Sequence, residues 1–122
     1  MGSLPRPDEL IAAQRSYRHG RISKDRLKDF YNRAVQTTVE QFEATGSPVI
    51  TDGEQTKPSF LTYPISALVD ECYTFSQDCF SLKFADGHQR ALPRLTKAPF
   101  RYAVYADTYM DLAREFTILP LK

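Results

Sequence analysis

The sequence has no tryptophan, only two cysteines and two histidines among its 122 residues, and 16 basic side chains that almost cancel its 15 acidic ones. Two cysteines are too few for a disulfide scaffold. A formal net charge of +1 lacks the basic excess typical of nucleic-acid or anionic-membrane binding. No run approaches the roughly 18 apolar residues that a transmembrane helix needs. With no secretory signal at the start, we expect a cytoplasmic protein that binds neither nucleic acid nor membrane.

Core-forming residues, by contrast, are plentiful. Hydrophobic residues make up 42% of the chain and include seven tyrosines and eight phenylalanines, which excludes disorder along the whole length. The length is that of one typical domain, since domains most often have roughly 100–150 residues. We therefore expect a single domain over residues 1–122.

Two helices are expected in the first 44 residues. The first runs from about Pro7 to His19, because two carboxylates in its first turn suit the positive end of the helix dipole and Gly20 suits a helix end. The second runs from about Lys24 to Ala44, with Ser23 as its N-cap, and ends at Gly46. Its apolar residues recur at three- and four-residue steps, which predicts a helix with one buried face.

A short apolar run and an acidic turn follow this helix. Pro48–Thr51 is rich in β-branched residues and predicts a buried strand, and Asp52–Gln55 predicts the turn that leaves it. Helix, tight turn and strand in that order favour an α/β unit. In such units, acidic residues just past the carboxyl end of a strand point into the usual ligand crevice.

The middle of the chain predicts a loop and a hairpin. Prolines interrupt any long helix between Gln55 and Asp78, so this stretch is expected to be a loop with one helical turn. Phe80–Phe84 and His88–Leu92 predict two antiparallel strands joined by a type I′ turn at Asp86–Gly87.

A third helix is expected from near Pro99 to Phe116, followed by the start of a strand at Ile118–Leu121. Aromatic side chains within this helix, at positions Tyr102, Tyr105, Tyr109 and Phe116, step at three, four and seven residues. That spacing is typical of a packing face.

Three stretches together resemble the cobalamin-independent methionine synthase family, and specifically its C-terminal catalytic barrel and short one-domain relatives. Met1–Pro7 is similar to the Gly-Ser-Leu/Phe-Pro element that leaves the first barrel strand. Val49–Gln55 resembles the (Asp/His)-Gly-Glu element that closes the second strand. The segment from Leu95–Tyr102 to Leu119–Lys122 resembles the one that leads through a helix into the third strand.

The resemblance implies an α/β fold, a partial (β/α)8 (TIM-type) barrel fragment with long helices and one β-hairpin. A complete barrel needs at least about 200 residues. The chain would therefore be a single truncated domain that corresponds to the N-terminal third of the barrel.

The resemblance also implies a zinc-dependent S-methyltransferase, in which a folate methyl group passes to a thiol such as homocysteine. Zinc suits this chemistry because it lowers the pKa of a bound thiol. The family's zinc ligands, a His-x-Cys pair, a Glu and a further Cys, lie on later strands. We therefore expect no metal site and no cofactor retained by this chain alone, with zinc and methyl-folate belonging to the family.

Site residues follow from the same resemblance. It implies that the amino-acid end of homocysteine binds to the first and second of these elements, at Met1, Gly2, Ser3 and Glu54. A folate contact is expected on the hairpin at Gln89 and Arg90. Read without the family, Glu54 is better interpreted as a solvated turn carboxylate, and Asp52 is equally a turn former or the partner of a basic residue.

Three functions remain open from the sequence. The first is a truncated methyltransferase that acts on an amino-acid thiol or other small molecule and needs a complementary chain or a homo-oligomer to complete it. The second is a non-catalytic interaction module or an inactive remnant of the family. The third is a repurposed small enzyme in which Asp52 and His88 serve with Glu54 as acid–base groups. Cys72, Cys79 and His88 match no zinc motif, so the cysteines are expected to be structural.

Overall fold

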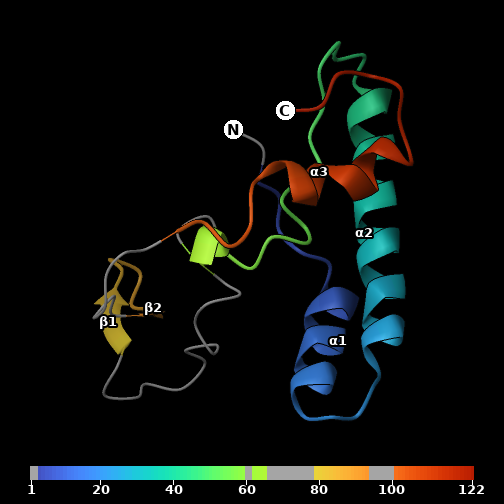
Figure 1. Cartoon of the computed structure of the whole chain (residues 1–122). Helices are drawn as coiled ribbons and strands as arrows, with labels where there is room; N and C mark the ends of the chain where they lie inside the picture. Colours follow the sequence, from blue (N-terminus) through green and yellow to red (C-terminus); the bar gives the residue numbers. More distant parts are fainter. Residues whose placement is uncertain (1–2, 60–61, 66–78, 94–100) are drawn as a thin grey trace. The chain divides into compact units, whose positions relative to one another are not determined.

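The computed structural model describes residues 3–59, 62–65, 79–93 and 101–122 (Figure 1). These residues fall into two compact units, one made of Met1–Lys57 with Asp107–Lys122 and the other of Pro58–Ala106. The predictions made for Met1, Gly2, Cys72 and the segment 95–100 lie outside the described residues.

The first unit opens with two antiparallel helices, α1 (Asp8–Arg18) and α2 (Lys24–Ala44), and both sequence predictions are confirmed to within a residue. The Ser23 Oγ accepts a hydrogen bond from the Arg26 backbone N–H at 3.1 Å, as an N-cap should. The helices pack through a small core that consists of Leu10, Ala13, Leu27 and Ala34.

A second core joins α2 to the end of the chain. Val35 and Val39 of α2, Ile50 and Ala113 are all buried together. Ala113 belongs to α3 (Asp107–Arg114), which packs against α2. The apolar face predicted for α2 is therefore covered by α1 near its start and by α3 near its end.

The two strands predicted at Pro48–Thr51 and Ile118–Leu121 meet as a single parallel bridge between Ile50 and Leu121. The Ile50 N–H donates to the Pro120 carbonyl at 3.0 Å, and the Lys122 N–H donates to the Ile50 carbonyl at 2.9 Å. Pro48 and Pro120 have no N–H to extend a ladder, which explains why neither segment forms a full strand. Two segments that pair in parallel, with a helix such as α3 between them in the sequence, are typical of an α/β crossover.

The third helix is shorter than predicted, because residues 101–106 are not helical and α3 begins only at Asp107. The backbone N–H groups of Ala103 and Val104 donate to the Pro64 carbonyl, at 2.6 and 3.3 Å, and so are not available to a helix. Tyr102 and Tyr105 are 62% and 64% exposed, so the predicted aromatic packing face is wrong at these two positions.

The second unit contains one 3-10 turn, η1 (Tyr63–Ile65), and the predicted hairpin of β1 (Cys79–Lys83) and β2 (Gln89–Pro93). The predicted type I′ turn is wrong. Gly87 has a φ of +87°, whereas Asp86 has no positive φ. Because the Gly87 N–H donates to the Phe84 carbonyl and the Phe84 N–H to the His88 carbonyl, the connection has three residues and ends in a left-handed glycine.

Within the described part of the chain, no helix is both long enough and apolar enough to span a membrane.

Candidate functional site

The acidic turn that follows Ile50 adopts an unusual backbone. Gly53 and Glu54 both have positive φ, of +67° and +55°, and Glu54 is the one non-glycine residue with this conformation among those the structure describes. The Asp52 Oδ1 accepts the Glu54 N–H at 2.9 Å, and the Thr51 Oγ1 accepts the Gly53 N–H at 3.2 Å. Positive φ in a non-glycine residue costs free energy and is common at functional sites.

Gly53 is tightly enclosed. A Cβ at this position would lie 2.9 Å from the Thr38 Cγ2, 3.2 Å from the Gln55 Nε2 and 3.4 Å from the Leu4 Cβ. The Gly53 carbonyl also accepts the Leu4 N–H at 3.0 Å. The segment that carries Ser3 is therefore attached directly to the acidic turn.

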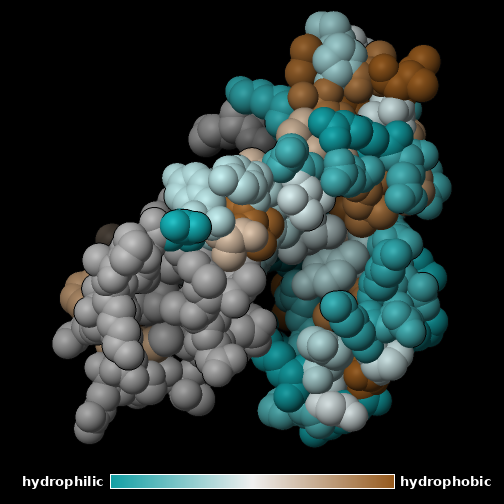
Figure 2. Space-filling model, viewed as in Figure 1, coloured by the Kyte–Doolittle hydropathy of each residue, from teal (hydrophilic) through white to brown (hydrophobic). Residues whose placement is uncertain are grey.

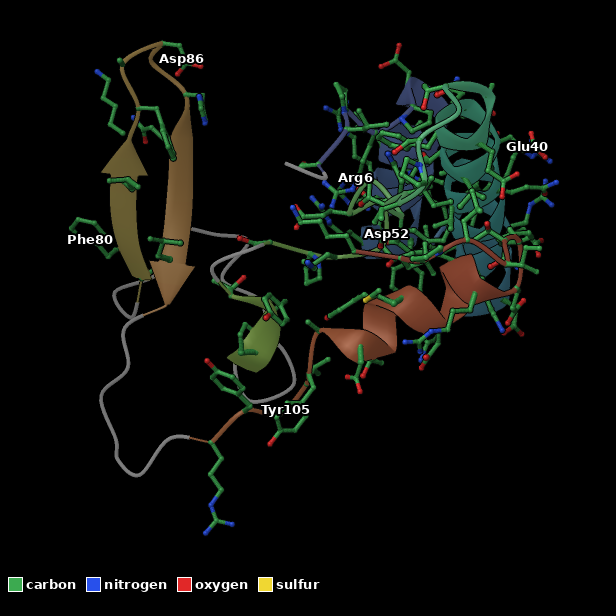
Figure 3. All side chains as sticks on the ribbon, turned by 90° about the horizontal axis from the view of Figure 1, so that it is seen from above. Arg6, Glu40, Asp52, Phe80, Asp86 and Tyr105 are labelled. Atoms are coloured by element: carbon green, nitrogen blue, oxygen red, sulfur yellow. The ribbon has the colours of Figure 1, made fainter. Side chains whose placement is uncertain are left out.

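Arg6 holds the other side of the turn. Its guanidinium donates to the backbone carbonyls of Gln55, at 3.0 Å, of Glu54, at 3.3 Å, and of Lys57. A planar, permanently charged fork suits this role because it can satisfy several carbonyls at once. Figure 3 shows Arg6 and Asp52 in the same crowded region of the first unit.

The Glu54 carboxylate binds an ammonium group. The Lys57 Nζ lies 2.9 Å from the Glu54 Oε1, and the two side chains are 16% and 31% exposed, respectively. The ion pair is therefore only partly solvated. The turn therefore pairs Glu54 with an ammonium group of the same chain.

Several buried side-chain oxygens of the turn are unpaired. The Asp52 Oδ2, the Gln55 Oε1 and the Thr56 Oγ1 are buried without a hydrogen-bond partner. Asp52 is 6% exposed and Gln55 is 1% exposed. Because a buried polar atom without a partner costs free energy, these oxygens make the turn a costly local arrangement.

The site residues predicted from the sequence are distributed over both units. Ser3, Asp52 and Glu54 belong to the first unit, and the structure brings Ser3 to the acidic turn through the Leu4–Gly53 hydrogen bond. Ser3 itself is exposed and Asp52 is buried. His88, Gln89 and Arg90 belong to the hairpin of the second unit, where Gln89 is exposed and Arg90 is the register partner of Leu82.

His88 contacts Asp86, which Figure 3 labels at the exposed hairpin turn. Its Nδ1 lies 2.5 Å from the Asp86 Oδ1, and its ring stacks on Phe84 with 4.3 Å between centroids. The hydrogen bond from the His88 side chain, together with the one from its backbone N–H, holds the pKa of Asp86 below its ordinary value.

We expect His88→Ala to raise the pKa of Asp86 towards the ordinary carboxyl value, because the principal hydrogen bond to the carboxylate is lost. The pKa is measured by NMR titration of the Asp86 carboxyl, with Asp25, on α2, as internal reference. Since the folded pKa is depressed, the stabilisation is present above the unfolded pKa and is lost as pH falls through the folded pKa. An unchanged Asp86 pKa in His88→Ala would contradict this hairpin contact.

No group of three or more His, Cys, Asp or Glu side chains that could hold a metal is found among the described residues. Cys79, at the start of β1, is disulfide-bonded, in agreement with a structural role. The described donor set therefore does not fit a zinc ion.

Arg6 and Lys57 were not predicted as site residues from the sequence. Lys57 follows Glu54 by three residues, a spacing at which opposite charges pair when the backbone curves, and this signal could have identified it. No local signal identifies Arg6, because its partners lie about 50 positions further along the chain.

Three curated proteins are similar to part of the chain. The methionine synthases of Sulfolobus acidocaldarius and Sulfurisphaera tokodaii are 33% and 35% identical over 63 residues, which is 52% of this chain and 19% of each relative. The 5-methyltetrahydropteroyltriglutamate–homocysteine methyltransferase of Syntrophotalea carbinolica is 30% identical over 74 residues, which is 61% of this chain and 10% of that protein.

The chain thus spans about a fifth or less of the length of these relatives. No family model matches it, and no solved structure matches it. The names of the three relatives agree with each other and with the family that the sequence motifs resemble. Over about half of its length, the chain therefore resembles the cobalamin-independent methionine synthases.

Proposed function

We propose that this chain supplies part of the amino-acid pocket of a methionine-synthase-like methyltransferase, and that Glu54 binds the α-ammonium of a thiol amino acid such as homocysteine. The observation that carries the proposal is the 2.9 Å contact between the Glu54 Oε1 and the ammonium of Lys57, because the ligand ammonium would make a contact of the same kind. A charge-assisted hydrogen bond of this type is among the stronger polar contacts.

Two further features support the proposal. The attachment of Leu4 to Gly53 places the backbone next to Ser3 beside the turn, where a ligand held by Glu54 would meet it. The unpaired oxygens of Asp52 and Gln55 add negative potential to the turn, which suits a positively charged group better than an anion.

Methyl transfer itself requires more than these residues. Zinc, where the family binds it, supplies a thiolate at neutral pH, and the described residues offer no group that fits it. We also propose that Gln89 and Arg90 contact folate, as the resemblance implies. Acid–base catalysis by Asp52 and by His88 is a separate proposal.

We propose that a complementary chain or a second copy completes the fold. Ile118 is fully exposed and Val49 is 45% exposed, and both lie within three residues of the Ile50–Leu121 bridge. Figure 2 shows hydrophobic residues at the surface over the loops that follow α2 and α3. Exposed apolar surface of this kind favours association, so the alternative of a non-catalytic interaction module would use the same face.

The test is binding of L-methionine and L-homocysteine to the full chain, measured by calorimetry and by NMR shifts of the Glu54 amide. We expect Glu54→Gln to weaken binding about tenfold or more, since a hydrogen bond to a charged group contributes about 1.5–3 kcal/mol. Glu40→Gln, which changes an exposed carboxylate of α2, is the matched control and should leave binding unchanged. Equal affinity of the wild type and Glu54→Gln would exclude the proposed role.

A further inference from the structure

The ammonium already bound at Glu54 belongs to the chain itself. Lys57 is less exposed than its partner, at 16% against 31%, so the carboxylate is the more open member of the pair. A free amino acid that approaches Glu54 therefore meets a carboxylate whose hydrogen bond is taken by Lys57 and which can be reached from solvent.

The backbone on both sides of this ion pair is held in place. Arg6 binds the carbonyls of Glu54 and of Lys57, and the Asp52 Oδ1 binds the Glu54 N–H. These contacts reach the main-chain atoms of Glu54 and Lys57 and not their side chains. They therefore stay intact when the Glu54 and Lys57 side chains separate. Exchange of one ammonium for another at Glu54 thus requires rotation of the Lys57 side chain and no movement of the turn.

We propose that Lys57 is an internal competitor for the ligand ammonium, and so limits the affinity of the Glu54 subsite for an amino acid; this inference rests on the proposed function. In the free protein the Lys57 ammonium occupies the position that the α-ammonium of the ligand takes. Binding exchanges one charge-assisted hydrogen bond for another, so the Glu54 carboxylate is never left without a counter-charge.

The exchange has a consequence for selectivity. A ligand without an amino group cannot replace the Lys57 ammonium at Glu54 and gains nothing by displacing it. An amino acid replaces it at little cost, since a carboxylate loses less when one cation substitutes for another than when it is left unpaired. Lys57 therefore limits affinity for the amino acid, while Glu54 provides the preference for it.

The test compares Lys57→Met with the wild type, using L-methionine and its desamino analogue 4-(methylthio)butanoate as probes. We expect Lys57→Met to bind L-methionine about two- to fivefold more tightly, because the competing and partly exposed ion pair is gone. It should bind the desamino analogue no better, since Glu54 then repels the carboxylate of that probe. Lys28→Met, which removes an exposed lysine of α2, is the matched control and should change neither affinity.

A second measurement uses the wild-type protein alone and does not depend on the variant. Saturating L-methionine should increase the acetylation rate of the Lys57 amine, followed by mass spectrometry, and should leave that of Lys28 unchanged. An unchanged Lys57 rate, or a Lys57→Met protein that binds L-methionine no more tightly than the wild type, would overturn the inference. If instead Glu54→Gln binds as well as the wild type, the proposed function itself fails, and the inference fails with it.

Discussion

Gly53→Ala should lower the free energy of unfolding of the first unit by about 2–4 kcal/mol. The left-handed backbone at this residue contributes about 1 kcal/mol, since alanine tolerates a φ of +67° poorly. Overlap of the new methyl group with the Thr38 Cγ2 at 2.9 Å adds about 1–3 kcal/mol, as insertions into a packed interior do. Urea unfolding, followed by the circular dichroism of α1 and α2, measures the change.

The matched control is Gly46→Ala. Gly46 has a φ of +73°, but nothing lies within 4 Å of the position that its Cβ would occupy. Only the backbone contribution of about 1 kcal/mol remains there. Equal destabilisation by the two substitutions would show that the close packing around Gly53 contributes nothing.

Arg6→Met should lower the same free energy of unfolding by about 2–3 kcal/mol. The methionine retains an apolar stem of similar length but leaves the carbonyls of Glu54, Gln55 and Lys57 without their donor. Arg6→Lys should recover only part of the loss, because an ammonium lacks the fork that spans several carbonyls. The measurement is again urea unfolding.

Arg33→Met is the control for charge alone. The Arg33 guanidinium lies 3.8 Å from the Glu9 carboxylate, and both side chains are more than half exposed. Such a pair contributes about 0–1 kcal/mol. If Arg6→Met destabilised the protein no more than Arg33→Met does, the role of Arg6 in holding the acidic turn would be refuted.

Helices α1 and α2 could be predicted because their signals are local. The Ser23 cap, the glycines that end each helix and the apolar residues at three- and four-residue steps all act within a few positions along the chain. The hairpin was predicted for the same reason, although the predicted type I′ turn was wrong. Asp86–Gly87 favours a turn without specifying how many residues the connection contains.

The third helix was predicted too long because a distant contact overrides its pattern. The periodic aromatic residues favour a helix through Tyr102 and Tyr105, but the backbone N–H groups of Ala103 and Val104 bind the Pro64 carbonyl instead. A hydrogen bond between residues about 40 positions apart leaves no trace in a local pattern.

The candidate site divides in the same way. The sequence by itself determined that an acidic turn follows a short apolar segment, and that Glu54 and Ser3 resemble a substrate-binding pair. Only the tertiary structure decided that Leu4 is attached to Gly53, that Arg6 holds three carbonyls of the turn and that Lys57 occupies the Glu54 carboxylate. The physical reason is that caps, turns and helical periodicity depend on neighbours along the chain, whereas the partners of a guanidinium and the space around a glycine depend on segments that meet only after folding.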